Sequence, residues 1–100
     1  LVPIRKKGKL PGNVLRQKYS LEYGNDEIQI HKGSINSKDK VLIIDDLIAT
    51  GGTAFASAQL VKKCKVKSIE FYFIIDLKNV GGSQKLKKKY KLSSILEAKG

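Results

Sequence analysis

Two apolar runs organise the second half of this chain. Four consecutive apolar residues at 41–44 predict a strand buried on both faces, as in a parallel sheet. A helical pattern follows over 54–63, and a second apolar run over 68–75 predicts another buried strand, with Phe71 and Phe73 on one face. Strand, helix and strand in this order are typical of an α/β fold.

The first forty residues have a different pattern. Residues 2–4 resemble the end of a strand, and a basic segment punctuated by glycine and proline follows over 5–12. Apolar and polar residues partly alternate over 14–23 and again over 27–31. Because Gly24-Asn25 lies between these segments, we expect a two-stranded ribbon that turns there.

The last third of the chain predicts shorter elements. The sequence Asn-Val-Gly-Gly at 79–82 interrupts the chain, residues 84–89 predict a short basic helix, and residues 94–96 predict a final strand. There is no internal repeat and no linker that would divide the chain.

A small, glycine-rich turn connects the first buried strand to the helix. Residues 49–53 read Ala-Thr-Gly-Gly-Thr. Gly51 and Gly52 allow a tight turn and let a ligand approach the backbone N–H groups. Those groups are unpaired at a helix start, where the helix dipole adds positive potential, and the hydroxyls of Thr50 and Thr53 are further donors. The turn therefore predicts a phosphate site.

Two carboxylates precede this turn, at the expected end of the strand. Asp45 and Asp46 can accept hydrogen bonds from sugar hydroxyls and can help to hold a hydrated Mg²⁺ near a pyrophosphate. Strand alternation points adjacent side chains to opposite faces, so the two acids have different roles unless the strand has already ended. Together the acids and the turn predict a sugar-phosphate site; the alternative is an ordinary solvated strand end before a helix.

Two familiar nucleotide motifs do not occur here. The turn has no Gly-Lys-Ser/Thr, which argues against a nucleoside-triphosphate P-loop, and no G-x-G-x-x-G follows a strand, which argues against a dinucleotide fold.

Residues 41–53 resemble the motif with which type I phosphoribosyltransferases bind 5-phosphoribosyl-1-pyrophosphate (PRPP). Upstream, Pro-Ile-Arg-Lys-Lys-Gly-Lys-Leu-Pro-Gly at 3–12 and Tyr-Ser-Leu-Glu-Tyr-Gly at 19–24 are similar to two segments of adenine phosphoribosyltransferases, in the same order and spacing. The resemblance extends from Val2 to about Leu86. The PRPP motif by itself indicates only the superfamily, and the upstream segments favour the adenine enzymes.

The resemblance implies a fold and a reaction. The fold would be part of a Rossmann-like parallel sheet with a flanking helix and a β-ribbon that forms a flexible loop. The reaction would be purine salvage, in which adenine and PRPP give AMP and pyrophosphate with Mg²⁺, in a homodimer. Members of this family are longer, so we expect residues 1–100 to be the C-terminal part of one phosphoribosyltransferase domain, without its N-terminal part and inactive alone.

The resemblance also implies roles for individual residues. Glu22 would exchange a proton with the purine, Tyr23 would help a mobile loop to close the site, and Leu77 would lie against the purine. The positions that match contacts to PRPP or AMP are Arg5, Lys6, Lys9, Asp45, Asp46, Ala49, Thr50, Gly51, Gly52 and Thr53. Without the motif, Glu22 is an acid on a ribbon surface and the basic residues form a solvated loop.

The net charge of +11 raises the alternative of a nucleic-acid surface. No helix-turn-helix, zinc finger or aromatic stacking motif accompanies the lysines, so a solvated lysine-rich surface is the favoured interpretation and nucleic acid is not an expected partner. Two other functions stay open: a PRPP-sensing transcriptional regulator of the same fold, and a phosphoribosyltransferase for another purine.

Composition adds three expectations. No apolar stretch has the length of a membrane span, so we expect no membrane association. Cys64 is the single cysteine, which excludes an internal disulfide and fits a reduced, cytoplasmic location. His31, the single histidine, has no sequence partners and is interpreted as structural.

Overall fold

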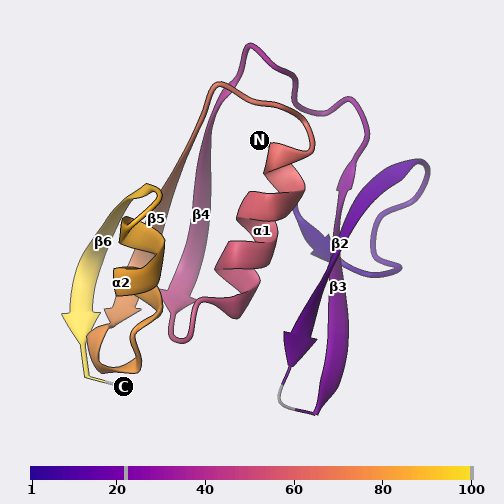
Figure 1. Cartoon of the computed structure of the whole chain (residues 1–100). Coiled ribbons are helices and arrows are strands. Elements are labelled where there is room, and N and C mark those ends of the chain that lie inside the picture. The colour runs from indigo at the N-terminus through magenta and orange to yellow at the C-terminus, as the bar shows by residue number, and fades with distance from the viewer. Residues whose placement is uncertain (22, 100) are drawn as a thin grey trace.

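The computed structural model of the chain describes residues 1–21 and 23–99. It contains a small antiparallel sheet and a parallel sheet, with helix α1 between them (Figure 1). The antiparallel sheet has the order β1-β3-β2 and the parallel sheet has the order β4-β5-β6. The elements are β1 (Arg5–Lys6), β2 (Val14–Leu21), β3 (Gly24–His31), β4 (Lys40–Ile48), α1 (Gly52–Lys62), β5 (Ser68–Leu77), the 3-10 helix η1 (Lys78–Val80), α2 (Gly82–Lys87) and β6 (Lys91–Ala98).

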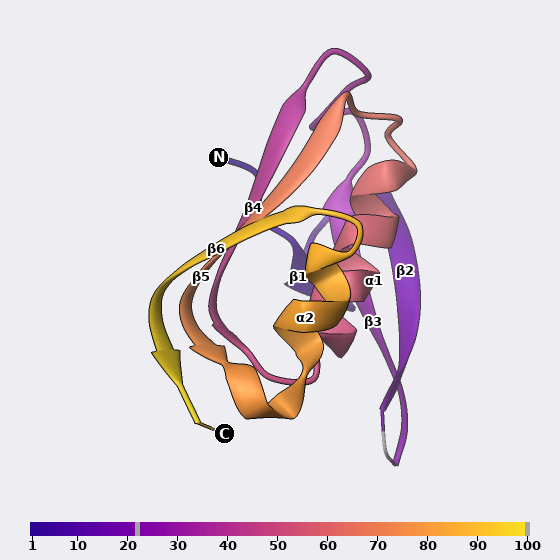
Figure 2. The ribbon, with the colours of Figure 1, turned by 60° about the vertical axis from the view of Figure 1, so that its left-hand side comes forward.

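The parallel sheet carries the predicted α/β core. Both helices lie on the same side of this sheet, as Figure 2 shows in side view. Phe71 and Phe73 of β5 point to that side, are almost completely buried and stack on each other with ring centroids 5.8 Å apart. They pack with Ile48, Ala58 and Leu86, so one cluster joins β4, β5 and both helices. The predicted α/β fold is thus confirmed.

The expectation that the strand at 41–44 is buried on both faces is wrong for the described residues. Leu42 is 52% exposed and Ile44 is 62% exposed. Ile74 of β5 and Ile95 of β6 are exposed as well. The reason is that α1 and α2 cover only one side of the sheet, and an apolar run indicates that a face avoids water without indicating what covers it.

The predicted ribbon is present and has a third strand. β2 and β3 pair over their full length, and β1 adds to the free edge of β3 by pairing Arg5 with Gln29 and Lys6 with Ile28. The strand expected at 2–4 is therefore displaced to Arg5–Lys6. Gly24 and Asn25 already belong to β3, because they pair with Leu21 and Ser20, so the turn comes earlier than predicted.

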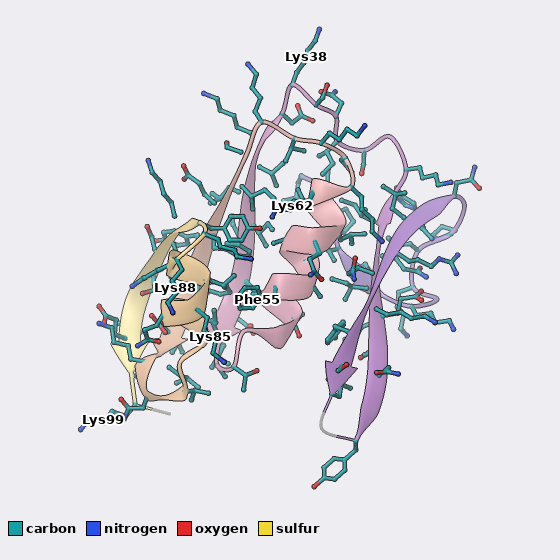
Figure 3. All side chains as sticks on the ribbon, in the orientation of Figure 1. Lys38, Phe55, Lys62, Lys85, Lys88 and Lys99 are labelled. Carbon is teal, nitrogen blue, oxygen red and sulfur yellow. The ribbon has the colours of Figure 1, made fainter. Side chains whose placement is uncertain are left out.

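Helix α1 connects the ribbon to the parallel sheet. Its buried residues Ala56 and Leu60 pack against Ile28 and Ile30 of β3. Phe55 is half-buried, packs against the core cluster of the parallel sheet and lies between α1 and α2 (Figure 3). One helix thus holds both sheets, and its N-terminal end follows directly from β4.

Several predicted boundaries are corrected by strand pairing. β4 extends from the predicted 41–44 to Ile48, so Asp45 lies inside the strand and pairs with Phe73. β5 continues to Leu77, so this residue ends the strand instead of following it. The last strand covers Lys91–Ala98, well beyond 94–96, because it pairs along most of β5. Pairing with a neighbour extended each strand past its apolar segment.

Candidate phosphate and sugar site

The loop at 49–53 connects the end of β4 to the start of α1. Gly51 has φ +87°, in the left-handed region that favours glycine, and it is the residue that caps the helix. Its carbonyl accepts the first helical hydrogen bond, from the N–H of Phe55 at 2.8 Å. No side chain caps this end of α1 within the described residues, apart from a long 3.5 Å contact between the N–H of Gly52 and the Thr50 Oγ1. The first N–H groups of α1 are therefore available to an anion.

Asp45 and Asp46 precede this loop on β4, and both are exposed. The N–H of Asp46 donates to Asp45 Oδ1 at 2.8 Å. Desolvation raises the pKa of the Asp45 carboxyl, and the neighbouring Asp46 carboxylate raises it further, against the opposing effect of that N–H. Two adjacent acids, of which Asp45 has the raised pKa, can accept hydroxyl hydrogens or share a cation.

Two hollows meet at this point. A small one of about 170 Å³ is lined by Asp45, by the whole loop 49–53 and by Phe73, among others. A larger groove of about 710 Å³ extends along β4 toward the N-terminal segment, and Lys6 contributes to its lining. Asp45 and Thr53 line both hollows. The structure thus brings together the predicted acid, the predicted loop and one predicted basic residue.

Lys6 already has a partner in this structure. It forms an ion pair with Asp26, donates to the Tyr19 hydroxyl at 2.6 Å, and lies 5.3 Å from the centre of the Tyr19 ring. The Asp26 hydrogen bond is the main cause that raises the pKa of Lys6, followed by the Tyr19 hydroxyl, and Lys6 in turn lowers the pKa of Asp26. Because an ammonium group has three N–H donors, Lys6 keeps one donor for a phosphate beside Asp26 and Tyr19.

The other predicted residues are spread over the surface. Tyr23 is 93% exposed at the end of the ribbon. Leu77 is half-buried at the end of β5, and Arg5 and Lys9 are exposed. None of these four lines either hollow within residues 1–21 and 23–99. Glu22 lies outside the described residues. His31 fits its structural interpretation, with its Nε2 2.7 Å from the carbonyl oxygen of Pro11.

Two residues near the loop were not predicted as site residues. The N–H of Gly82, at the start of α2, donates to the carbonyl of Ala49 at 3.0 Å. Asp76 pairs with Ile48 across the sheet, is 1% exposed, and has no hydrogen-bond partner for either carboxylate oxygen in the described part of the chain. The sequence contained a signal for both: the Gly-Gly interruption, and an acid after an apolar run, as at Asp45.

Known proteins match the chain over its whole length. A profile described as "Phosphoribosyl transferase domain" matches residues 1–100. The chain belongs to this phosphoribosyltransferase family. The adenine phosphoribosyltransferase of Campylobacter curvus is 57% identical over 98 residues, which are 96% of this chain and 54% of that enzyme. The chain spans about half the length of the curated relatives that it matches.

Solved structures agree with the family assignment. The adenine phosphoribosyltransferase of Rhodothermus marinus superposes with a TM-score of 0.89 and 43% identity, over 96% of this chain and 55% of that one. The Trypanosoma brucei enzyme, in complex with AMP, pyrophosphate and ribose-5-phosphate, gives a TM-score of 0.84 and 30% identity, over 96% of this chain and 45% of that one. The resemblance inferred from the sequence is confirmed.

Among the described residues, no helix combines the length and apolar character needed to cross a membrane. In the same residues, no three or more His, Cys, Asp or Glu side chains are grouped so that they could hold a metal ion by themselves.

Proposed function

We propose that this chain supplies the PRPP- and AMP-binding part of an adenine phosphoribosyltransferase, which converts adenine and PRPP to AMP and pyrophosphate. The observation that carries the proposal is the small hollow in which Asp45 and the loop 49–53 lie together at the uncapped start of α1. An anion at this position meets backbone donors and the positive end of a helix dipole. The named relatives support adenine as the purine.

In this proposal the ligand is oriented by its two ends. The loop N–H groups and the hydroxyls of Thr50 and Thr53 bind the 5′-phosphate, because the loop surrounds the small hollow. Asp45, which lines the small hollow, accepts hydrogen bonds from the ribose hydroxyls, and Asp46, the next residue of β4, helps to hold a hydrated Mg²⁺. The pyrophosphate then lies toward the larger groove, whose lining includes Lys6. Arg5 and Lys9, from the same basic segment of the sequence, are the further proposed phosphate contacts. Such fixed positioning and charge stabilisation are the main contributions that a protein makes to this type of transfer.

The carboxylates fit a role with magnesium. Mg²⁺ keeps most of its water and binds through one or two carboxylates together with substrate phosphates, so it does not require a cluster of three protein ligands. Asp45 and Asp46, one exposed pair beside the proposed phosphate site, meet that requirement. The ion would supply positive charge to the pyrophosphate oxygens.

The remaining roles follow the family resemblance. We propose that Glu22 exchanges the purine proton, that Tyr23 closes over the site, and that Leu77 contacts the purine. The exposure of Tyr23 at the end of the ribbon leaves it free to move with such a closing loop. For the complete protein we propose a cytoplasmic homodimer; the unpaired Cys64 fits a reducing compartment, and the dimer follows from the resemblance.

A chimera tests the function directly. In it, this chain replaces the matching stretch of the Campylobacter curvus enzyme, which is 57% identical. With PRPP and Mg²⁺, the purified chimera should form AMP from adenine and should discriminate strongly against hypoxanthine, guanine and xanthine. The unmodified Campylobacter enzyme is the positive control. A folded chimera without PRPP-dependent turnover would contradict the proposal, and turnover with another purine would reassign the base.

A further inference from the structure

The start of α2 is in backbone contact with the loop at 49–53. In Figures 1 and 2 the first turn of α2 lies beside the loop that joins β4 to α1. A Cβ atom built on Gly82 would lie 2.3 Å from the Ala49 carbonyl oxygen, 2.5 Å from the Thr50 carbonyl carbon and 2.6 Å from the Gly51 nitrogen. All three are backbone atoms of the loop, so the loop itself would have to move to admit any side chain.

The contact is reciprocal. A Cβ atom built on Gly51 would lie 3.2 Å from Gly82 Cα, so each glycine faces the other without a side chain between them. The N–H of Gly82 also donates to Ala49. A hydrogen bond and a close backbone contact thus determine how far the loop lies from α2.

The backbone conformation of residue 82 does not require a glycine. It is a helical residue of α2 and is not among the glycines with positive φ, whereas the adjacent Gly81 has φ +96° with open space around it. Gly81 is therefore glycine because of the turn, and Gly82 is glycine because of the space that the loop occupies. Replacement of the two residues should consequently have different effects.

We infer that Gly82 is a positioning residue: it sets the place of the Ala49–Gly51 backbone and therefore the direction of the N–H groups that bind the phosphate. This inference rests on the function proposed above. Gly82 touches no substrate in this scheme and acts only through the loop. Because reacting groups must be held closely, a shift of about 1 Å in such a loop can change binding or rate by about 100-fold.

The test compares three variants of the chimera. Gly82→Ala should weaken the affinity for ribose 5-phosphate, measured by isothermal titration calorimetry, about 10- to 100-fold. It should raise the KM for PRPP similarly and leave the KM for adenine within about twofold. Gly81→Asn should bind normally, because Asn tolerates the left-handed conformation. Gly33→Ala, at a positive φ of +78° in open space, should lower Tm and leave binding unchanged.

Hydrogen exchange gives a readout that does not depend on a variant folding. In the unsubstituted chimera, exchange of the Gly82 amide should slow when ribose 5-phosphate binds, because this amide is bonded to the loop. Gly82→Ala should accelerate exchange of a peptide covering 47–55. An unchanged Gly82 amide on binding, or an unchanged ribose 5-phosphate affinity in folded Gly82→Ala, would overturn the inference.

The experiments distinguish failure of the proposed reaction from failure of the proposed role of Gly82. A chimera that binds ribose 5-phosphate and forms no AMP would contradict the reaction and leave the Gly82 comparison valid. Normal AMP formation, with equal ribose 5-phosphate affinity in the parent and Gly82→Ala, would overturn the role of Gly82 and leave the reaction in place. No binding of ribose 5-phosphate by the folded parent chimera would overturn both.

Discussion

At the scale of single residues, the site depends on groups whose ordinary interactions are left incomplete. In the part of the chain that the structure describes, no side chain caps the start of α1, and Asp45 and Asp46 lie next to each other in spite of their like charges. A ligand that brings phosphate to the N–H groups, and hydroxyls or a cation to the acids, would complete both sets of interactions.

The first prediction concerns these acids. Asp45→Asn and Asp46→Asn keep the side-chain shape and remove the charge, so each should lower kcat/KM for PRPP in the chimera. The expected loss is about 10- to 100-fold, because a hydrogen bond to a charged group contributes about 1.5–3 kcal/mol. Thermal melting should change little, since both side chains are exposed. Variants that melt far below the parent and retain full activity per folded molecule would instead indicate a structural role.

The second prediction concerns pH. The raised pKa of Asp45 means that the folded chain holds this proton more tightly than the unfolded chain. The free energy of unfolding should therefore fall as pH rises from the ordinary value of 3.8 through the raised pKa. Asp46→Asn should lower the pKa of Asp45 and reduce this fall, as measured by carbon NMR of the carboxyl groups with urea unfolding at each pH.

The control is Asp26, whose pKa is lowered by Lys6 and by the N–H of Glu27. Its contribution has the opposite sign, present above 3.8 and lost as pH falls through the lowered pKa. The pKa of Asp26 should not change in Asp46→Asn. If Asp45 titrates identically in the parent and in Asp46→Asn, the neighbouring charge does not contribute to the shift.

At the scale of elements, α1 has two roles that depend on different ends. Its N-terminal end provides the proposed anion site, and its buried side holds the ribbon against the parallel sheet. The basic helix α2 covers the core with Leu86, while Lys85 and Lys88 project away from the sheet (Figure 3). The lysines of α2 and its C-terminal cap are exposed in this structure.

The third prediction tests how α1 connects the two sheets. Leu60 is completely buried against Ile28 and Ile30, so Leu60→Ala should reduce the free energy of unfolding by about 2–5 kcal/mol in the chimera. The matched control is Gln59, the adjacent exposed residue. Gln59→Ala should change the free energy of unfolding by no more than about 0.5 kcal/mol. Urea unfolding measures both, and equal effects would argue against this packing.

At the scale of the whole molecule, one face of the parallel sheet is apolar and uncovered. The exposed apolar residues of this face and of the edge strands are Leu42, Ile44, Ile74, Ile95 and Leu96. A large exposed apolar surface favours association. These relatives are nearly twice as long as this chain.

The fourth prediction follows from that face. Purified residues 1–100 should bind the dye ANS, self-associate in analytical ultracentrifugation, and form no measurable AMP from adenine and PRPP with Mg²⁺. Ile44→Lys should reduce both dye binding and association, whereas Gln59→Lys, on the exposed side of α1, should change neither. A monomer with low dye binding and steady turnover, free of host enzyme, would contradict this prediction.

Much of the proposed site could be predicted because it is local. Strand, acids, glycine turn and helix occupy 41–53 and the residues that follow directly, so their relative placement depends on short-range geometry. Gly51 in the left-handed conformation and Asp45 beside the loop follow from residue types and order alone. The ribbon at 14–31 was predictable for the same reason, since its strands are adjacent along the chain.

The sequence by itself therefore determined the type of each main element, the glycine turn before α1 and the family. Tertiary structure decided the rest: how far β4 and β6 extend, that Lys6 pairs with Asp26, that Gly82 meets the loop, and that residues 1–21 and 23–99 leave one sheet face exposed. The physical reason is that periodicity and local motifs report which groups avoid water or favour a turn. Which distant segment meets those groups depends on packing among elements that are far apart along the chain.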